Sequence, residues 1–308
     1  MFLTGNDEVS RYELATALLP PRWQRIARGI SDGDKAEAEE LRLRAGYPLT
    51  VLLPTGESRA GAENQTVTPQ DLEQLCDIIT SYSRYAVSSL MAQGYLIAPG
   101  GFRVGLCGSG VMEGSVCRNL RRLSSANIRI SREQCGSAGP VLRQIMADGA
   151  FRSTLIVAPP GAGKTTLLRD MVRDLSDGIS APVAYRMAVV DERGEIAGMY
   201  HGMPQFQVGS HTDILDGIPK SIGITMLLRA ANPQIIAVDE ITAREDIAPM
   251  LQAANCGVKL LATIHAADMA ELKRKPLFAK LLGLQVFERA VFIGREGKMR
   301  RYRMEELL

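Results

Sequence analysis

Residues 158–165 combine glycine, lysine and threonine at the spacing of a phosphate-binding loop. They read Ala158-Pro159-Pro160-Gly161-Ala162-Gly163-Lys164-Thr165. The loop follows the apolar run 153–157, which we expect to be a buried strand, and precedes 165–175, which we expect to be a helix; the motif requires this context. Because glycine has no Cβ, the backbone can fold closely around a phosphate and direct its N–H groups at it.

The residues that end this loop carry the chemistry of nucleotide binding. We expect Lys164 to lie between the β- and γ-phosphates of ATP and the Thr165 hydroxyl to bind Mg²⁺, while Thr166 completes an ATP-binding segment that begins at Ala158. The first position of the motif is usually glycine and here is Ala158. The inner glycines and the Lys-Thr pair perform most of the binding, so the difference is mild.

Two further apolar runs end in polar residues. Residues 234–240 end in Asp239 and Glu240, as a Walker B strand does. We expect Asp239 to hold Mg²⁺ through water or Thr165, and Glu240 to orient and polarise the attacking water. Residues 258–266 end in Thr263-x-His265. The carboxyl ends of parallel strands meet at one crevice, so both side chains are expected to face the γ-phosphate.

A third acidic strand end and an arginine are weaker candidates. Residues 188–195 offer Asp191, Glu192 and Glu195, one of which would assist Glu240 or bind the water around the metal; an acidic surface turn explains them nearly as well. Residues 226–232 read as a helix that stops before a proline, with Arg229 in the last turn. Arg229 either contacts a γ-phosphate or a neighbouring subunit, or stabilises the negative end of its helix.

Composition favours a protein of the reducing cytoplasm. The 308 residues carry a net charge of +2, which creates no strong field toward nucleic acid or anionic lipid. We find no apolar run of about eighteen residues that would span a bilayer, so association with a membrane would go through a partner. Five cysteines without paired short spacings argue against a disulfide framework or zinc site, and three histidines argue against a histidine-rich metal centre.

The chain divides near a small, flexible segment at 136–140 that ends in proline. Residues 1–135 predict an α+β domain with helices over 9–30, Trp23 as a core anchor, hairpins at 41–53 and 95–107, and a capped helix from Thr68. Residues 141–308 alternate strands and helices, which predicts a RecA-like P-loop ATPase domain. Its fold class is α/β, a mostly parallel sheet with helices on both faces.

The order of these motifs resembles that of the type II and type IV secretion ATPases and, within that superfamily, the stage III sporulation protein AA family. The resemblance runs from about residue 40 to about residue 292. Two positions depart from it: Phe102 stands where histidine is expected, and Thr242 where glycine is expected. It rests on the segments 40–44, 47–49, 93–96, 99–106, 127–133, 190–193, 238–241 and 257–259.

The resemblance implies a ring-forming motor, usually a hexamer, that hydrolyses ATP at its subunit boundaries. Arg129 and Arg132 would then approach the nucleotide of a neighbour in trans, while a solvated position or a surface pair with Asp or Glu explains them nearly as well. The implied client is a membrane-embedded sporulation channel, reached from the mother-cell cytoplasm. Two other classes stay open: a nucleic-acid-dependent RecA-like ATPase, which the near-neutral charge disfavours, and an ATP-gated scaffold for a membrane partner, which has no need of Glu240.

Overall fold

The computed structural model describes residues 8–61, 64–81, 88–146, 148–296 and 299–308. The chain forms two compact units. The N-terminal unit comprises Met1–Glu133 together with Gly198–Gln205, and the C-terminal unit comprises Gln134–Ala197 and Phe206–Leu308. The sequence did not predict that the short segment 198–205 would group with the first unit.

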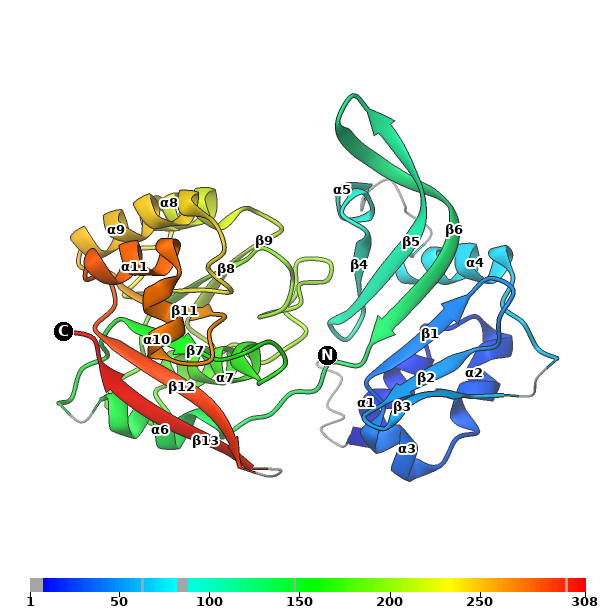
Figure 1. Ribbon diagram of the computed structural model, residues 1–308, viewed down its shortest axis with the longest axis horizontal. Coiled ribbons are helices and arrows are strands. Elements are labelled where there is room, and N and C mark those ends of the chain that lie inside the picture. The colour runs from blue at the N-terminus through cyan, green and yellow to red at the C-terminus, as the bar shows by residue number, and fades with distance from the viewer. Residues whose placement is uncertain (1–7, 62–63, 82–87, 147, 297–298) are drawn as a thin grey trace. The chain divides into compact units, whose positions relative to one another are not determined.

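A six-stranded sheet forms the frame of the N-terminal unit (Figure 1). Its order is β3-β2-β1-β6-β5-β4, and every neighbouring pair is antiparallel. The predicted hairpins around residues 46–48 and 99–101 are confirmed as β1–β2 and β4–β5. The strands are β1 (Glu40–Arg44), β2 (Thr50–Leu53), β3 (Gly56–Arg59), β4 (Tyr95–Ala98), β5 (Phe102–Glu113) and β6 (Val116–Arg129).

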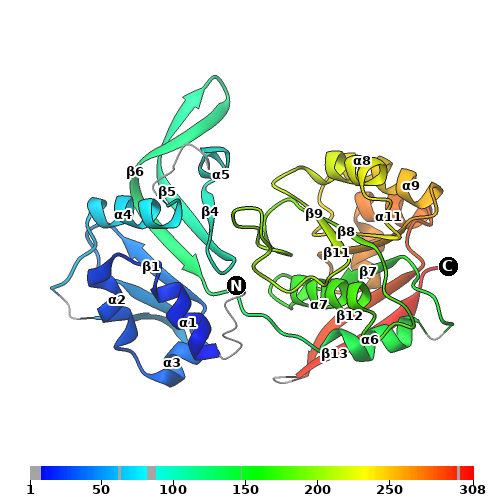
Figure 2. The same ribbon diagram turned by 180° about the vertical axis from the view of Figure 1, so that it is seen from behind.

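Helices cover the apolar face of this sheet. Leu41, Leu43, Val104 and Ile128 are fully buried and belong to one core with residues of the helices. The side with α1, α2 and α4 faces the viewer in Figure 2. The helices are α1 (Glu8–Thr16), α2 (Pro21–Arg28), α3 (Asp32–Glu37), α4 (Pro69–Ile79) and α5 (Ser88–Ala92).

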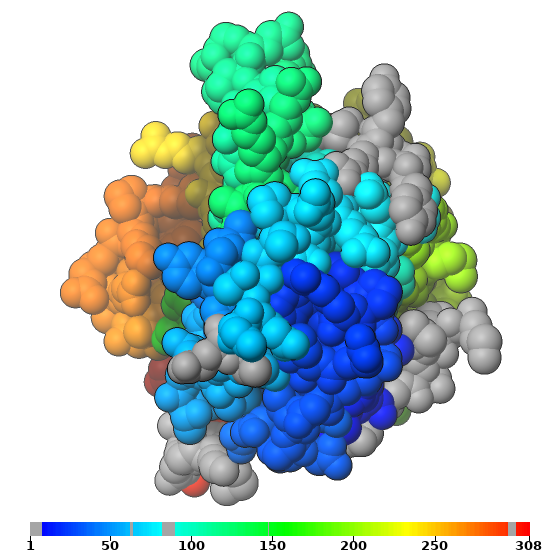
Figure 3. Space-filling view, turned by 90° about the vertical axis from the view of Figure 1, so that its right-hand side faces the viewer, coloured from blue at the N-terminus to red at the C-terminus, as the bar shows by residue number. Residues whose placement is uncertain are grey.

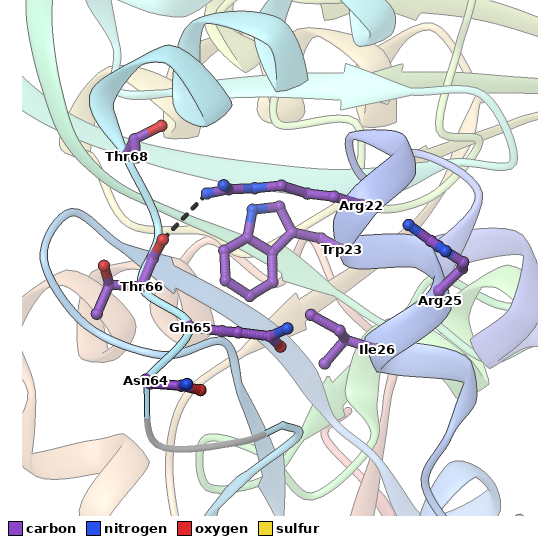
Figure 4. A pocket seen from close by; sticks show the side chains of 8 residues that line it. All are labelled: Arg22, Trp23, Arg25, Ile26, Asn64, Gln65, Thr66 and Thr68. Carbon is purple, nitrogen blue, oxygen red and sulfur yellow. Dashed lines mark hydrogen bonds between the residues drawn. The ribbon is translucent and has the colours of Figure 1, made fainter.

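Trp23 on α2 is the predicted core anchor and is 1% exposed. It lies beside a cavity of about 600 Å³ between α2 and residues 64–68 (Figure 4). Arg22 donates to the carbonyl of Thr66 over 3.0 Å and pairs with Asp71. Asp71 also accepts from the backbone N–H of Thr68 over 2.6 Å, which closes the cap of α4. Arg22 on α2 and Asp71 in the first turn of α4 therefore connect the two helices.

The long ends of β5 and β6 form an arm that projects from the N-terminal unit (Figure 3). The sequence predicted the first of these strands only to Cys107, whereas β5 continues to Glu113 and pairs with β6 along the whole arm. Most side chains of β5 after Leu106 are exposed. A ribbon exposed on both faces has no alternation of apolar and polar residues, which is why the pattern missed it.

The C-terminal unit contains a seven-stranded sheet of order β13-β12-β7-β11-β10-β8-β9. All neighbouring pairs are parallel except β12–β13. The four residues of β7 and those of β10 are all buried, as the apolar runs predicted. The strands are β7 (Thr154–Val157), β8 (Met187–Asp191), β9 (Thr212–Asp216), β10 (Ile235–Val238), β11 (Lys259–Ile264), β12 (Arg289–Glu296) and β13 (Met299–Glu306).

Helices lie on both faces of this sheet, as expected. The core that contains Leu155 and Val157 includes residues of α8, α9, α10 and α11. α7 contacts β7, β8, β9 and β11. Among the described residues, no helix is both long enough and apolar enough to span a membrane. The helices are α6 (Ala138–Ile145), α7 (Lys164–Asp177), α8 (Lys220–Ala230), the short 3₁₀ helix η2 (Arg244–Asp246), α9 (Ile247–Asn255), α10 (Met269–Arg274) and α11 (Pro276–Gly283).

The segment 136–140, predicted as a linker, is partly helical because α6 begins at Ala138. The carboxylate of Asp170 on α7 accepts from the Ala138 N–H over 2.7 Å and from the Ser137 hydroxyl over 3.1 Å. Sequence pattern could not reveal this cap, since the acid lies some thirty residues downstream. The C-terminal half of the segment is therefore held against α7.

Candidate nucleotide-binding site

Four parallel strands end at the same edge of the C-terminal sheet. Val157 of β7 pairs with Ile264 of β11, and Val238 of β10 pairs with Val190 of β8. The residues that follow these ends are Ala158, His265, Asp239 and Asp191. The edge where ligands bind in open α/β sheets therefore carries the phosphate-loop motif and the acidic ends of β8 and β10.

The phosphate loop turns from β7 into α7 through two glycines with positive φ. Gly161 has φ +72° and Gly163, which caps α7, has φ +97°. A side chain would strain both positions. The loop leaves the first N–H groups of α7 without partners inside the helix, and these groups together with the helix dipole attract anions.

Lys164 is held inside the loop that it ends. Its ammonium donates to the carbonyls of Ala158 and Pro159 over 3.0 and 2.9 Å, and its side chain is almost fully buried. Burial lowers the pKa of Lys164, while the charges of Glu240 and Asp239 act in the opposite direction. The cation is thus in place at the loop before any phosphate arrives.

A chain of polar contacts joins this lysine to the end of β10. Lys164 Nζ lies 2.7 Å from His265 Nδ1, and His265 Nε2 lies 3.0 Å from the Glu240 carboxylate. A histidine that accepts at Nδ1 carries its proton at Nε2, so it donates to Glu240. Arg193, which the sequence did not single out, lies 3.9 Å from the same carboxylate.

Asp239 is buried beside the same loop and is only 6% exposed. Thr263 donates to it over 3.4 Å. Burial raises the pKa of Asp239 to about 7, and the charges of Glu195 and Asp191 add to the effect. A carboxylate in such a place is poorly solvated, and a bound cation would relieve that cost.

Asp191 at the end of β8 and the two glutamates that follow it have different surroundings. Asp191 accepts from the backbone N–H groups of Glu195 over 2.8 Å, Ile196 over 3.1 Å and Ala197 over 2.8 Å. Glu192 pairs with Lys220, which is buried at the start of α8. The Glu195 carbonyl accepts from Arg169 over 2.6 Å. Asp191 and Glu192 thus shape the loop, and Glu195 is the acid of the three whose charge reaches both Lys164 and Asp239.

Lys220 was missed by the sequence analysis, although a signal was present. It is the first residue of α8, where the helix dipole disfavours a cation. A lysine in that position needs an acid nearby, and Glu192 supplies it. The predicted candidate Arg229 lies in the last turn of α8, exposed beside Ile222 and Met226 on a surface hollow.

The two arginines predicted to act in trans have different environments. Arg132 donates to the carbonyls of Lys35 over 3.4 Å, Ala36 over 2.6 Å and Ala38 over 2.8 Å, at the C-terminal end of α3. Desolvation lowers the pKa of its half-buried guanidinium. Arg129 is exposed on β6, between Glu40 of β1 and Arg103 of β5. Arg132 would have to release three carbonyls to reach a phosphate, whereas Arg129 would not.

The fold is similar to that of solved secretion ATPases, and the C-terminal unit is RecA-like. The ATPase DotB of Legionella pneumophila aligns over 93% of this chain and 80% of its own, with a TM-score of 0.59 and 16% identity. The pilus retraction motor PilT, solved with bound ADP, aligns over 87% of this chain and 79% of its own, with a TM-score of 0.59 and 15% identity.

Sequence comparison identifies the family. Residues 13–304 match the family described as sporulation stage III, protein AA. Stage III sporulation protein AA of Bacillus subtilis (strain 168) is 34% identical over 281 residues, which span 90% of this chain and 89% of the relative. The chain belongs to the sporulation stage III, protein AA family.

Proposed function

We propose that this protein is an Mg²⁺-dependent ATPase whose chemistry is performed by Lys164 and Glu240. The contact chain from Lys164 through His265 to Glu240 is the observation that supports this most strongly. It joins the group that would bind phosphate to the group that would activate water. Neither a plain nucleotide-binding scaffold nor an acidic surface turn requires such a connection.

The residues at the strand ends suit ATP and magnesium. Gly161 and Gly163 allow the close backbone approach that a triphosphate needs, as their positive φ values indicate. The Thr165 hydroxyl and the Asp239 carboxylate are oxygen donors, the type that Mg²⁺ prefers. When bound, the ion would neutralise part of the charge on the phosphates.

The protein groups have separate roles in this proposal. Lys164 exchanges the two loop carbonyls for phosphate oxygens, which accept more strongly because they are charged. Glu240 accepts the proton of the attacking water. His265 donates to Glu240 and fixes the orientation of its carboxylate, so it acts as a positioning residue.

The working form in this proposal is a ring of identical subunits, with six as the expected number. The secretion-ATPase fold supports it, because related proteins with this fold are described as a retraction motor and as ATPases. Family membership supports a role in sporulation, with a membrane-embedded channel complex as client. The protein would work at the mother-cell side of that membrane and reach it through its partner.

Arg129 is the better candidate for completing a neighbour's site in such a ring. Its side chain is exposed, whereas the guanidinium of Arg132 donates to three carbonyls at the end of α3. An arginine supplied in trans is worth on the order of 10³ to 10⁵ in rate in other phosphoryl-transfer enzymes. Hydrolysis should therefore increase more steeply than linearly with protein concentration.

One set of samples tests both activity and assembly. Light scattering gives the molar mass with and without ATP and Mg²⁺, while phosphate release is measured on the same samples and with single-stranded DNA or RNA added. We expect a nucleotide-dependent ring and partial activity when Glu240→Gln protein is mixed with Arg129→Ala protein. Constant specific activity from nanomolar to tens of micromolar, with no rescue on mixing, would contradict the ring. Strong stimulation by nucleic acid would favour a different class of ATPase.

A further inference from the structure

The C-terminal hairpin brings an arginine to the phosphate loop. β12 runs parallel to β7, and Phe292 pairs with Val157, the last residue of β7. β12 continues to Glu296, and β13 returns with Arg300 paired to Arg295. Arg300 therefore lies about three residues, or roughly 10 Å, beyond the level where β7 gives way to the loop. The β12–β13 hairpin therefore lies beside the phosphate loop.

The guanidinium of Arg300 covers Gly163. A Cβ added to this glycine would lie 2.7 Å from Cζ, 2.7 Å from Nη2 and 2.9 Å from Nε of Arg300. Three nearly equal distances mean that the flat face of the guanidinium rests over the Gly163 Cα. Any side chain at position 163 would displace Arg300, so this glycine also makes room for the arginine.

The guanidinium of Arg300 is also hydrogen-bonded to a neutral side chain, that of Gln134. Its Nη1 donates to the side-chain oxygen of Gln134 over 2.6 Å. Within the described part of the chain, no carboxylate lies within ion-pair distance of Arg300. An amide fixes the guanidinium but leaves its charge uncompensated, and the charge is half-buried. This charge lies over Gly163, the residue before Lys164, in the loop that we expect to bind phosphate.

We propose that Arg300 contacts the diphosphate part of the bound nucleotide and is a second cation of the site. This inference rests on the proposed function, since it assumes that the phosphate loop binds a nucleotide. Backbone N–H groups of such loops hold the α- and β-phosphates, and the loop lysine reaches the β- and γ-phosphates. Because Arg300 lies over Gly163, its charge acts on the part that ATP and ADP share.

The position of Arg300 predicts how its removal changes nucleotide affinity and turnover. Removing Arg300 should weaken ATP and ADP equally, on the order of tenfold, which is the size of one charge-assisted hydrogen bond in a half-exposed site. The turnover at saturating ATP should change little, because the γ-phosphate contacts and Glu240 are untouched. The KM for ATP should increase in parallel with the dissociation constant.

Calorimetric titration of the full-length protein with Mg·ATP and with Mg·ADP tests this. The variants are Arg300→Ala, Arg300→Lys, which keeps the charge, and Arg301→Ala, which removes a neighbouring arginine on the opposite face of β13. We expect Arg300→Ala to lose about tenfold for both nucleotides, Arg300→Lys to recover most of the loss, and Arg301→Ala to bind like the parent. Thermal unfolding without nucleotide shows whether each variant is folded. If Arg300→Ala does not fold, the affinities of Arg300→Lys and the parent are compared instead.

Other results would overturn the inference in distinguishable ways. Parent-like affinity of Arg300→Ala for both nucleotides would remove Arg300 from the site and leave the proposed ATPase intact. A loss for ATP alone would contradict its placement beside the diphosphate. If the unmodified protein bound neither nucleotide, the proposed function itself would fail, and the inference with it.

Discussion

The ends of β8 and β10 carry the same dipeptide but make different contacts. The two strands are parallel neighbours, Val190 pairs with Val238, and each is followed by Asp-Glu. Both aspartates are buried. Sequence alone therefore presents two equivalent acidic strand ends at one edge of the sheet.

The partners of the two ends differ. Asp191 accepts three backbone N–H groups of its own loop, and Glu192 is paired with Lys220. At the other end, Asp239 accepts from Thr263, and Glu240 is linked through His265 to the phosphate loop. The hydrogen bonds at the end of β8 thus hold its own loop, while the end of β10 is connected to Lys164 of the proposed nucleotide site. Identical acids acquire different roles from what their hydrogen bonds already satisfy.

The largest effect that sharpens this comparison is expected from Lys164→Ala. The variant removes the cation that is connected to the β10 end, and we expect ATP affinity to decrease on the order of 1,000-fold in calorimetric titration. The matched control is Lys259→Ala, at the opposite end of β11, where Lys259 pairs with Glu288. Unchanged ATP affinity of Lys164→Ala would show that the phosphate loop has been misread.

The second effect is a pH dependence of the free energy of unfolding, which we expect from Asp239 at the end of β10. The folded protein retains a proton on Asp239 up to about pH 7, whereas the unfolded chain releases it near the ordinary pKa of 3.8. A raised folded-state pKa makes this contribution to stability largest at low pH and removes it as the pH rises from about 4 to about 7.

Without nucleotide, this group should lower the free energy of unfolding by up to about 4 kcal/mol across that interval. Denaturant unfolding of the parent and of Asp239→Asn between pH 4 and pH 8 measures it, since the asparagine variant lacks this dependence. If the free energy of unfolding depended on pH in the same way in both proteins, the raised pKa of Asp239 would be contradicted.

A smaller effect is expected from Asp191→Asn. An amide retains one acceptor oxygen for three N–H groups and places an NH₂ against them, so we expect the free energy of unfolding to decrease by about 2–3 kcal/mol. Asp213→Asn is the control, because Asp213 is exposed on the adjacent β9. If Asp191→Asn were as stable as the parent and only turnover fell, the β8 end would take part in catalysis and the comparison would break.

The sequence predicted much of the C-terminal unit because its signals are local. The apolar runs at 153–157, 234–240 and 258–266 correspond to β7, β10 and β11, and the residues after them lie together in the structure. Lys164, His265 and Glu240 could be grouped in advance because parallel strands end at a common edge.

Contacts between distant segments could not be predicted in this way. Nothing near Asp191 in the sequence distinguishes it from Asp239, since the difference lies in the direction of the following loop. Arg300 is about 140 residues from Gly163 and approaches it only because β12 pairs with β7. The arm formed by β5 and β6 was missed because both of its faces are exposed. Residues 198–205 group with the N-terminal unit through contacts such as Tyr200 with Ile79.

Phosphate release at saturating ATP and Mg²⁺, compared between Glu240→Gln and Glu192→Gln, tests most directly whether chemistry takes place at the β10 end. Both variants replace the glutamate that follows a buried aspartate, so they are matched in charge and in position. We predict that Glu240→Gln still binds ATP but turns over on the order of 100- to 10,000-fold more slowly, because the water loses its base. Glu192→Gln should stay within about threefold of the parent, since its carboxylate serves an ion pair with Lys220. Parent-like turnover by Glu240→Gln, together with a large loss in Glu192→Gln, would contradict the account.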